Sequence, residues 1–153
     1  MGFIYADIEL INPKDNSLKP LSVNALVDTG AMTLCIPEHI AVQLKLEEIE
    51  KREVTTADSK SHVVPYVGPI QLRFEGRNCF TGALVIGDSV LMGAVPMEDM
   101  DLVINPSRRT ITVNPNSPNI PSALVKSVVP NVFNWSESLP RLAFPFLDFK
   151  NHP

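Results

Sequence analysis

The stretch Ala25-Leu26-Val27-Asp28-Thr29-Gly30-Ala31 decides how the rest of the chain is interpreted. An apolar run typical of a strand delivers an aspartate at its end, Gly30 permits a tight turn, and the small Ala31 leaves space beside the carboxylate. An Asp-[Ser/Thr]-Gly triplet arises by chance in a chain of this length at a rate on the order of 5%. In most isolated triplets the aspartate forms only an Asx turn with a nearby backbone N–H. The rest of the sequence is therefore needed to decide whether Asp28 has a chemical role or only forms a local turn.

The composition indicates one globular domain. Of 153 residues, 44% are hydrophobic and 20% are charged, a balance that allows a buried core. The net charge of -4 lacks the basic excess of a phosphate-binding surface, so we expect no nucleic-acid partner. No stretch reaches the roughly 20 apolar residues that cross a bilayer, and no signal peptide is evident. We therefore expect a cytoplasmic protein without a membrane partner.

Cysteine and histidine spacing raises a metal-binding alternative. Cys35 and His39 have the i, i+4 spacing of two zinc ligands on one helical face, and His62 and Cys79 are further candidates. A zinc site needs a third and usually a fourth ligand, which the sequence does not provide at a recognisable spacing. Buried, reduced thiols and a surface histidine are favoured, so we expect no metal and no cofactor.

The first two thirds of the chain alternate short β segments with turn-forming residues. The segment from Ile4 to Leu10 has the period-2 alternation of a half-buried strand, and residues 12–17 form a turn into a second strand at 21–27. A further hairpin is predicted from Val54 to Tyr66, with residues 57–61 at its exposed tip. The remaining predicted strands are 68–74, 80–86 and 110–113. Short strands with regular turns are typical of an all-β barrel or sandwich.

Two short helices are predicted among these strands. In the first, from Pro37 to Leu46, the proline suits the first turn, and Ile40 and Leu44 share one face. In the second, from Pro96 to Leu102, a proline start is followed by acidic residues that suit the positive end of a helix.

After residue 117 the chain changes character. Prolines interrupt every possible element of residues 118–153, because proline lacks the N–H that helices and sheets use. This tail carries Trp135, Phe144, Phe146 and Phe149, which is too much apolar surface for a solvated linker. We expect a domain of residues 1–117 and a proline-rich tail that packs on the barrel, braces a dimer or occupies a substrate cleft.

Several motifs, in their order along the chain, resemble those of the retropepsin-like aspartic peptidases, particularly the bacterial members. Residues 26–31 match the signature apolar-apolar-Asp-Thr-Gly-Ala, and residues 33–37 resemble the strand and turn that follow it. The hairpin 54–66 falls where the family has its substrate-covering flap. Residues 90–94 look like the second apolar-apolar-Gly element, which in the family passes behind the active-site turn. The resemblance runs from about residue 3 to 115 and implies a closed β-barrel with an active site at a two-fold homodimer interface.

The resemblance also implies roles for individual residues. Asp28 would carry the reaction, the Thr29 hydroxyl would contact its counterpart across the dimer axis, and Gly30 would offer backbone groups near the substrate. The expected substrate contacts are Ala31, Thr56, Ala57, Asp58, Val64, Leu91 and Met92.

The chemistry of metal-free peptide hydrolysis agrees with these roles. One carboxylate must take a proton from water while a second, protonated carboxyl group donates a hydrogen bond to the scissile carbonyl. No other aspartate of the chain is followed by Ser/Thr-Gly, so the second carboxyl group must come from Asp28 of another subunit. The sequence predicts a homodimeric aspartic endopeptidase acting on polypeptides. The alternative is a non-catalytic module that keeps the fold for dimerisation or peptide binding, which has no need for an acid at this turn.

Overall fold

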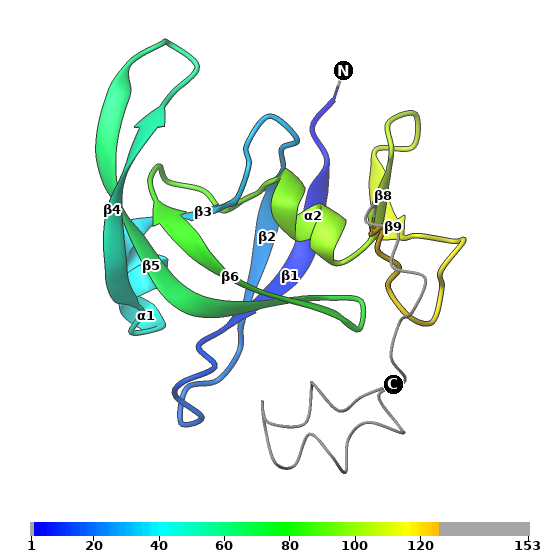
Figure 1. Cartoon of the computed structure of the whole chain (residues 1–153), viewed down its shortest axis with the longest axis horizontal. Coiled ribbons are helices and arrows are strands. Elements are labelled where there is room, and N and C mark those ends of the chain that lie inside the picture. The colour runs from blue at the N-terminus through cyan, green and yellow to red at the C-terminus, as the bar shows by residue number, and fades with distance from the viewer. Residues whose placement is uncertain (1, 126–153) are drawn as a thin grey trace, which may run out of the picture. The chain divides into compact units, whose positions relative to one another are not determined.

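The computed structural model describes residues 2–125 and is mostly β with two short helices (Figure 1). The elements in chain order are β1 (Tyr5–Ile11), β2 (Leu21–Val27), β3 (Leu34–Ile36), α1 (Glu38–Gln43), β4 (Glu47–Thr55), β5 (Ser61–Phe74), β6 (Arg77–Val85), β7 (Leu91–Met92), α2 (Ala94–Asp99), β8 (Leu102–Asn105) and β9 (Thr110–Val113). The residues up to Ala123 form one compact unit. The expected contacts of Trp135, Phe144, Phe146 and Phe149 lie outside the described residues, and the domain boundary at 117 stays a prediction.

Seven strands form one sheet in the order β1-β2-β7-β3-β6-β5-β4, and β8 pairs with β9 in a separate sheet. Strand β1 also pairs with β5, where residues 9–11 lie opposite residues 71–73. Six strands are therefore linked in a ring of pairings, while β4 lies outside the ring and pairs only with β5. Within residues 2–125 no helix is long and apolar enough to span a membrane.

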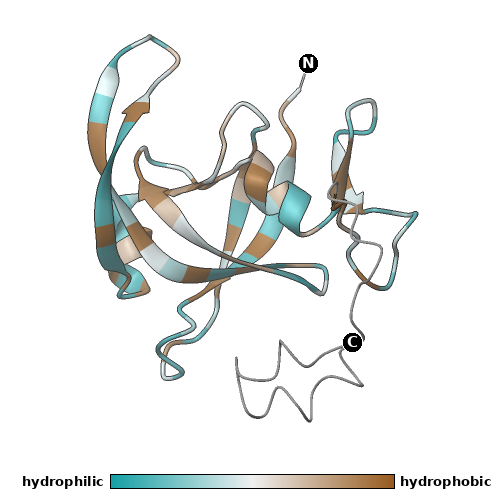
Figure 2. Cartoon of the chain, viewed as in Figure 1, coloured by the Kyte–Doolittle hydropathy of each residue, from teal (hydrophilic) through white to brown (hydrophobic). Residues whose placement is uncertain are grey.

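The alternation predicted for the first strand is confirmed. Ala6, Ile8 and Leu10 are buried while Tyr5 and Asp7 are exposed, and Figure 2 shows the corresponding change of hydropathy along the ribbon. One face of the strand thus contributes to the core, in which each fully buried Leu or Ile contributes about 1.5–3 kcal/mol. The strand itself begins and ends one residue later than expected.

Strand β5 is longer than expected. Residues 62–66 and 68–74 were predicted as two strands, and that prediction is wrong, because one strand runs from Ser61 to Phe74. Pro69 has no N–H to donate, and the pairing with β6 shifts register between Val67 and Ile70. This irregularity lets the chain pass the proline without ending the strand, so the β4–β5 hairpin is continuous with the ring of strands.

The helices differ from expectation mainly at their ends. Helix α1 covers residues 38–43, and both Ile40 and Leu44 are buried as predicted. Helix α2 begins at Ala94 rather than Pro96 and ends at Asp99 rather than Leu102. The two acidic residues, Glu98 and Asp99, therefore lie at its carboxyl end, and the argument that placed them at the positive end of the helix dipole is wrong.

Asp101, which follows α2 with a positive φ of 55°, binds the chain that comes after β9. Its carboxylate accepts hydrogen bonds from the Ser117 hydroxyl, from the Asn114 amide at 3.0 Å and from the Ser122 N–H at 2.9 Å. These three donors lower the pKa of Asp101 to about 2, with Ser117 contributing most, then Asn114 and then Ser122. The buried Arg77 guanidinium adds a hydrogen bond to the Ser117 carbonyl.

We expect Asp101→Asn to loosen residues 114–122, because the amide replaces a charged acceptor while tolerating the positive φ. The depressed pKa means that the carboxylate stabilises the fold above its unfolded pKa of about 3.9 and loses this effect as the pH falls toward about 2. The melting temperature of the variant should thus lie below that of the wild type at pH 7, and the gap should close in acid. Hydrogen exchange at the Ser122 amide measures the loss of its hydrogen bond to Asp101 directly. Unchanged protection of this amide in the variant would show that Asp101 does not hold residues 114–122 in place.

Candidate active site

Asp28 follows the end of β2 and is positioned by β7. The two strands are parallel, with Leu26 opposite Leu91 and Val27 opposite Met92. The Asp28 N–H donates to the Met92 carbonyl at 3.0 Å. The backbone that carries the carboxylate is therefore part of the sheet up to Asp28.

The turn itself holds one carboxylate oxygen of Asp28. Oδ1 accepts a hydrogen bond from the Gly30 N–H at 2.9 Å, and the Ala31 N–H donates to the Asp28 carbonyl at 3.2 Å. A Cβ at position 30 would lie 3.1 Å from Oδ1, so glycine allows this close approach. The Gly30 bond is the Asx contact that the local-turn alternative anticipates, and here it orients a half-buried carboxylate beside an exposed Thr29. A turn role and a chemical role are therefore compatible.

Gly93 lies directly behind this turn, as expected for the second apolar-apolar-Gly element. The Ala94 and Val95 N–H groups donate to the carbonyls of Ala31 and Met32, each at 2.8 Å. A Cβ at position 93 would meet the Ala31 carbonyl oxygen at 2.7 Å and the Thr33 carbonyl oxygen more closely still. The first turn of α2 thus packs against the turn that follows Asp28, and only glycine at position 93 leaves room for this contact.

We expect Gly93→Ala to destabilise the fold by about 1–3 kcal/mol, because the methyl group meets backbone that cannot move aside as a flexible side chain would. Denaturant unfolding measures this change. Gly76→Asn is the control, since a Cβ there meets nothing within 4 Å and asparagine tolerates its positive φ of 80°. Equal stability of the two variants would show that Gly93 has no packing role.

The strand pairings define one face of the sheet that leads away from Asp28. Residues that are directly opposite in paired strands project from the same face. Starting two residues before Asp28, the row of mutually opposite residues is Leu26, Leu91, Cys35, Leu84, Tyr66 and Glu50. Neighbouring positions such as Ala25, Leu34 and Ala83 are fully buried in the core. The row therefore lies on the face away from the core and joins the Asp28 turn to the β4–β5 hairpin.

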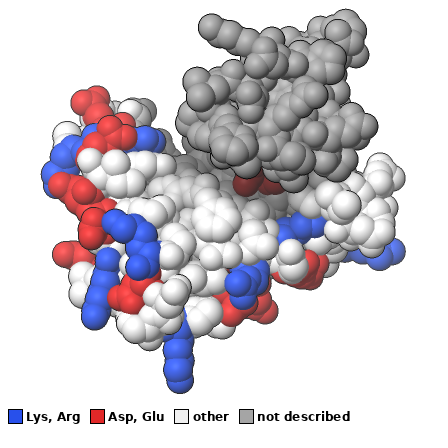
Figure 3. Space-filling view, turned by 60° about the horizontal axis from the view of Figure 1, so that its bottom comes forward, with Lys and Arg blue, Asp and Glu red and all other residues white. Residues whose placement is uncertain are grey.

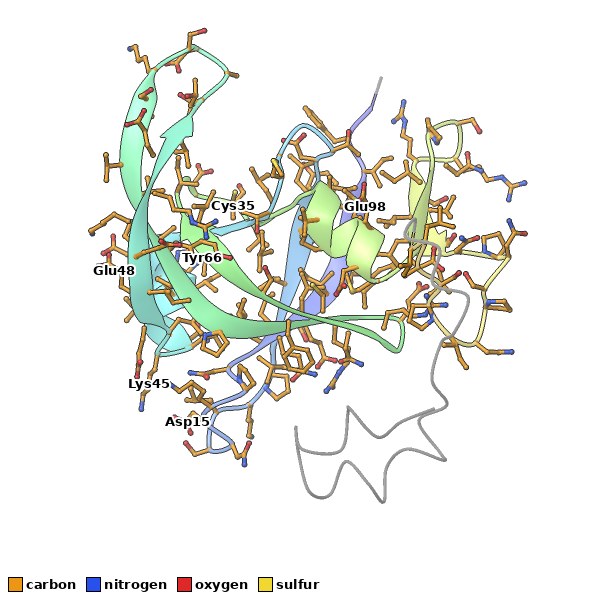
Figure 4. All side chains as sticks on the ribbon, viewed as in Figure 1. Asp15, Cys35, Lys45, Glu48, Tyr66 and Glu98 are labelled. Carbon is orange, nitrogen blue, oxygen red and sulfur yellow. The ribbon has the colours of Figure 1, made fainter. Side chains whose placement is uncertain are left out.

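Cys35 is the member of this row whose pKa is affected by the charge of Asp28. Burial raises the pKa of its thiol first, and the negative charge of Asp28 raises it further. In Figure 4, Cys35 and Tyr66 are close together in the view, on β3 and β5, as their places in the row imply. Cys35 is consequently a neutral, buried thiol on β3 near the Asp28 turn, and not a nucleophile.

The structure does not support the geometry on which the zinc alternative was based. Cys35 lies on β3 and only His39 lies on α1, so the assumption that both share one helical face is wrong. Cys35 and Cys79 are both free and buried, and burial is the main cause that raises the pKa of Cys79 to about 12. Among residues 2–125 there is no group of three or more His, Cys, Asp or Glu side chains that could hold a metal ion.

The β4–β5 hairpin has a tip closed by its own polar groups. The Thr56 N–H donates to the Lys60 carbonyl at 2.9 Å, and Asp58 accepts hydrogen bonds from the Thr56 hydroxyl and from the Lys60 N–H. These two bonds, the hydroxyl first, lower the pKa of Asp58. The expected substrate contacts Thr56, Ala57 and Asp58 therefore lie together at the tip, as one polar turn.

The other expected substrate contacts are distributed over two environments. Ala31 lies on the Asp28 turn, and Leu91 is half-buried in the row beside Leu26. Val64 is buried on β5, and Met92 is fully buried in the core. All of these substrate contacts stay predictions. The half-buried row members Leu26, Leu84 and Tyr66 were not among the expected contacts, because membership of the row depends on strand register.

A cavity of about 540 Å³ lies elsewhere, at the base of the hairpin. It is lined by residues of α1, β4 and β5 and by residues 85–87, and it includes none of the expected site residues. It faces the side of β5 that carries Val67, the opposite side from Tyr66. We therefore do not assign the catalytic site to this cavity.

Comparison with known families matches residues 16–117 to the family described as aspartyl protease. The chain belongs to the aspartyl protease family, which confirms the resemblance found in its motifs. Among solved structures, the solution structure of the simian foamy virus (mac) protease is similar, with 20% sequence identity and a TM-score of 0.42. That likeness covers 61% of this chain and 90% of the viral chain. Comparison with curated proteins gives no match.

Proposed function

We propose that the chain is an aspartic endopeptidase in which paired Asp28 carboxylates from two identical subunits activate the attacking water. The observation that carries the proposal is the geometry of Asp28 in a chain of the aspartyl protease family. Its backbone is bonded to Met92, one carboxylate oxygen accepts the Gly30 N–H, and the carboxyl group is half-exposed at the end of β2. A carboxylate held in this way is available to a second carboxylate and to a substrate.

The reaction needs the two carboxyl groups in different protonation states. Two adjacent carboxyl groups share one proton because their like charges oppose double ionisation. The ionised Asp28 takes a proton from water as the water oxygen bonds to the scissile carbonyl carbon, and the protonated Asp28 of the other subunit donates a hydrogen bond to the carbonyl oxygen. Collapse of the tetrahedral intermediate breaks the C–N bond, and a carboxyl proton passes to the leaving amine.

The surface around the turn supports a two-fold dimer. Met32 is 74% exposed and Val95 is 44% exposed, and the Val95 N–H donates to the Met32 carbonyl. Phe3, just before strand β1, and Tyr5, at the start of that strand, are also exposed, and Tyr5 lies opposite Leu26. Apolar side chains gathered around a catalytic turn are suited to burial against the same surface of a second copy.

The ring of strand pairings supports a closed barrel, with the β4–β5 hairpin as the flap that covers an extended polypeptide. A mobile hairpin admits the substrate and then excludes water from the reaction. The main chain of an extended peptide pairs with strand edges, and alternate side chains contact the faces on either side.

A digest of a random peptide library tests the proposal, with the wild type beside Asp28→Asn and cleavage products identified by mass spectrometry. Cleavage by the wild type alone supports it. A wild type that retains peptides on a column without cutting them supports the peptide-binding module instead.

A further inference from the structure

Three residues of the β4–β5 hairpin form a cluster with no part in the proposed chemistry. The Arg52 guanidinium carbon lies 3.6 Å from the centre of the Tyr66 ring, a cation–π distance. Glu50 Oε1 accepts hydrogen bonds from Arg52 Nε at 3.1 Å and from Nη2 at 2.8 Å. The ring and the carboxylate therefore both contact the guanidinium and favour one placement of it over the strand.

Tyr66 is itself held by the adjacent strand. The Gly82 N–H donates to the Tyr66 hydroxyl at 3.2 Å, and a Cβ at position 82 would lie only 2.5 Å from that hydroxyl oxygen. Any larger residue at 82 would displace the ring. The platform beneath Arg52 thus depends on β6, which also carries Leu84 of the row beside Cys35.

One edge of the Arg52 guanidinium is open. Glu50 occupies the edge formed by Nε and Nη2, the Tyr66 side chain is a further partner of the guanidinium, and among the residues that the structure describes no second carboxylate contacts Arg52. The side chain is 46% exposed. The remaining edge presents two N–H groups in the planar arrangement that matches a carboxylate.

The cluster lies on the face that leads from Asp28. Tyr66 and Glu50 are members of the row, and Arg52 is two residues from Glu50 and so projects from the same face. Tyr66 is four strand spacings from Leu26 on the strand that precedes Asp28, which amounts to about 20 Å along the sheet. An extended peptide covers that distance with about six residues.

We propose that Arg52 is a specificity-determining residue that binds an acidic side chain of the substrate several residues from the scissile bond. The inference rests on the proposed endopeptidase function. Glu50 offsets part of the positive charge and the site is open to solvent, so we expect the preference for Asp or Glu over Asn or Gln at that position to be about tenfold in kcat/KM.

Because β4 carries charges of both signs, seen intermixed on the left side in Figure 3, the control has to remove a neighbouring positive charge. Lys51 provides it, since it projects from the opposite face and pairs with Glu48 at 2.7 Å. The variants are Arg52→Gln, Arg52→Glu and Lys51→Gln. Each variant is prepared as the full-length chain and used to digest the random peptide library. Residue frequencies are then compared at every position around the cleaved bonds.

The expected result is an Asp/Glu preference at one position in the wild type and in Lys51→Gln, its loss in Arg52→Gln, and a Lys/Arg preference in Arg52→Glu. Total cleavage separates this inference from the proposed function. Cleavage without an acidic preference, or with one that survives in Arg52→Glu, overturns the inference alone. A wild type that cleaves no peptide overturns the endopeptidase function and the inference with it.

Discussion

Replacing Asp28 with asparagine is expected to lower the rate of peptide hydrolysis by about a thousandfold or more. General acid–base catalysis contributes about 10²–10⁴-fold to a rate, and this one substitution changes both members of the dyad because the same residue comes from each subunit. The fold should be retained, since an amide oxygen can still accept the Gly30 N–H that now binds Oδ1. The measurement is the initial rate on a library-derived peptide, together with the circular dichroism spectrum of the variant.

Asp15→Asn is the matched control for the loss of one negative charge. Asp15 lies in the β1–β2 turn, at the other end of β2 from Asp28, and within residues 2–125 its carboxylate accepts hydrogen bonds from Ser17 alone. Its substitution should leave the rate unchanged. Undiminished hydrolysis by purified Asp28→Asn would exclude an aspartic mechanism.

The pH dependence of the wild type provides an independent check on the dyad. The active form carries one proton on two carboxyl groups, so kcat/KM should rise and then fall with pH, reporting two constants that belong to the pair. A rate that increases steadily into alkaline pH would indicate a histidine or cysteine base instead.

Strands with a clear apolar pattern between turn-forming residues were predictable from the sequence, and the short strands β7 and β8 were not. Strands β2 and β9 have the predicted bounds, because turn-forming residues flank clear apolar patterns. Strand β7 has only two residues, so no periodicity exists to detect, and only the resemblance of residues 90–94 indicated it. Strand β8 was missed because its first residue had been assigned to the preceding helix.

The start of α2 shows why a local rule failed. Proline is favoured in the first turn of a helix, and Pro96 was taken as its start. The actual start at Ala94 is decided by the N–H groups of Ala94 and Val95, which donate to the carbonyls of Ala31 and Met32. Those partners lie more than sixty residues away in the chain, so a local pattern could not reveal them.

The position of Asp28 was predictable, whereas the row that extends from it was not. Asp28 is recognisable from contiguous residues, but Leu84 and Cys35 become neighbours only through a parallel pairing of β3 with β6. The register of the β4–β5 hairpin could have been predicted from its tip. Glu50 and Tyr66 are equally far from Asp58 in the chain, which places them opposite each other, as the structure has them.

Dilution is expected to abolish activity, because each site needs two copies of Asp28 and the chain supplies one. Below the dissociation constant of the dimer, the dimer fraction falls in proportion to concentration, so a tenfold dilution should lower the rate per subunit by about tenfold. Sedimentation velocity at the same concentrations should show the loss of dimer. Met32→Lys should move this transition to higher concentration, since it introduces a charge on an exposed apolar residue beside the turn.

Mixing wild type with Asp28→Asn distinguishes a shared site from a loss of stability on dilution. At a fixed total concentration, random pairing makes the fraction of wild-type dimers equal to the square of the wild-type fraction, so an equal mixture retains about a quarter of the activity. The variant should pair at least as well as the wild type, because replacing one of two adjacent carboxylates removes their repulsion. If each subunit worked alone, the same mixture would retain about half of the activity, and the rate per subunit would not depend on concentration. Observing both of these results would overturn the dimeric site and require a second carboxyl group from within the same chain.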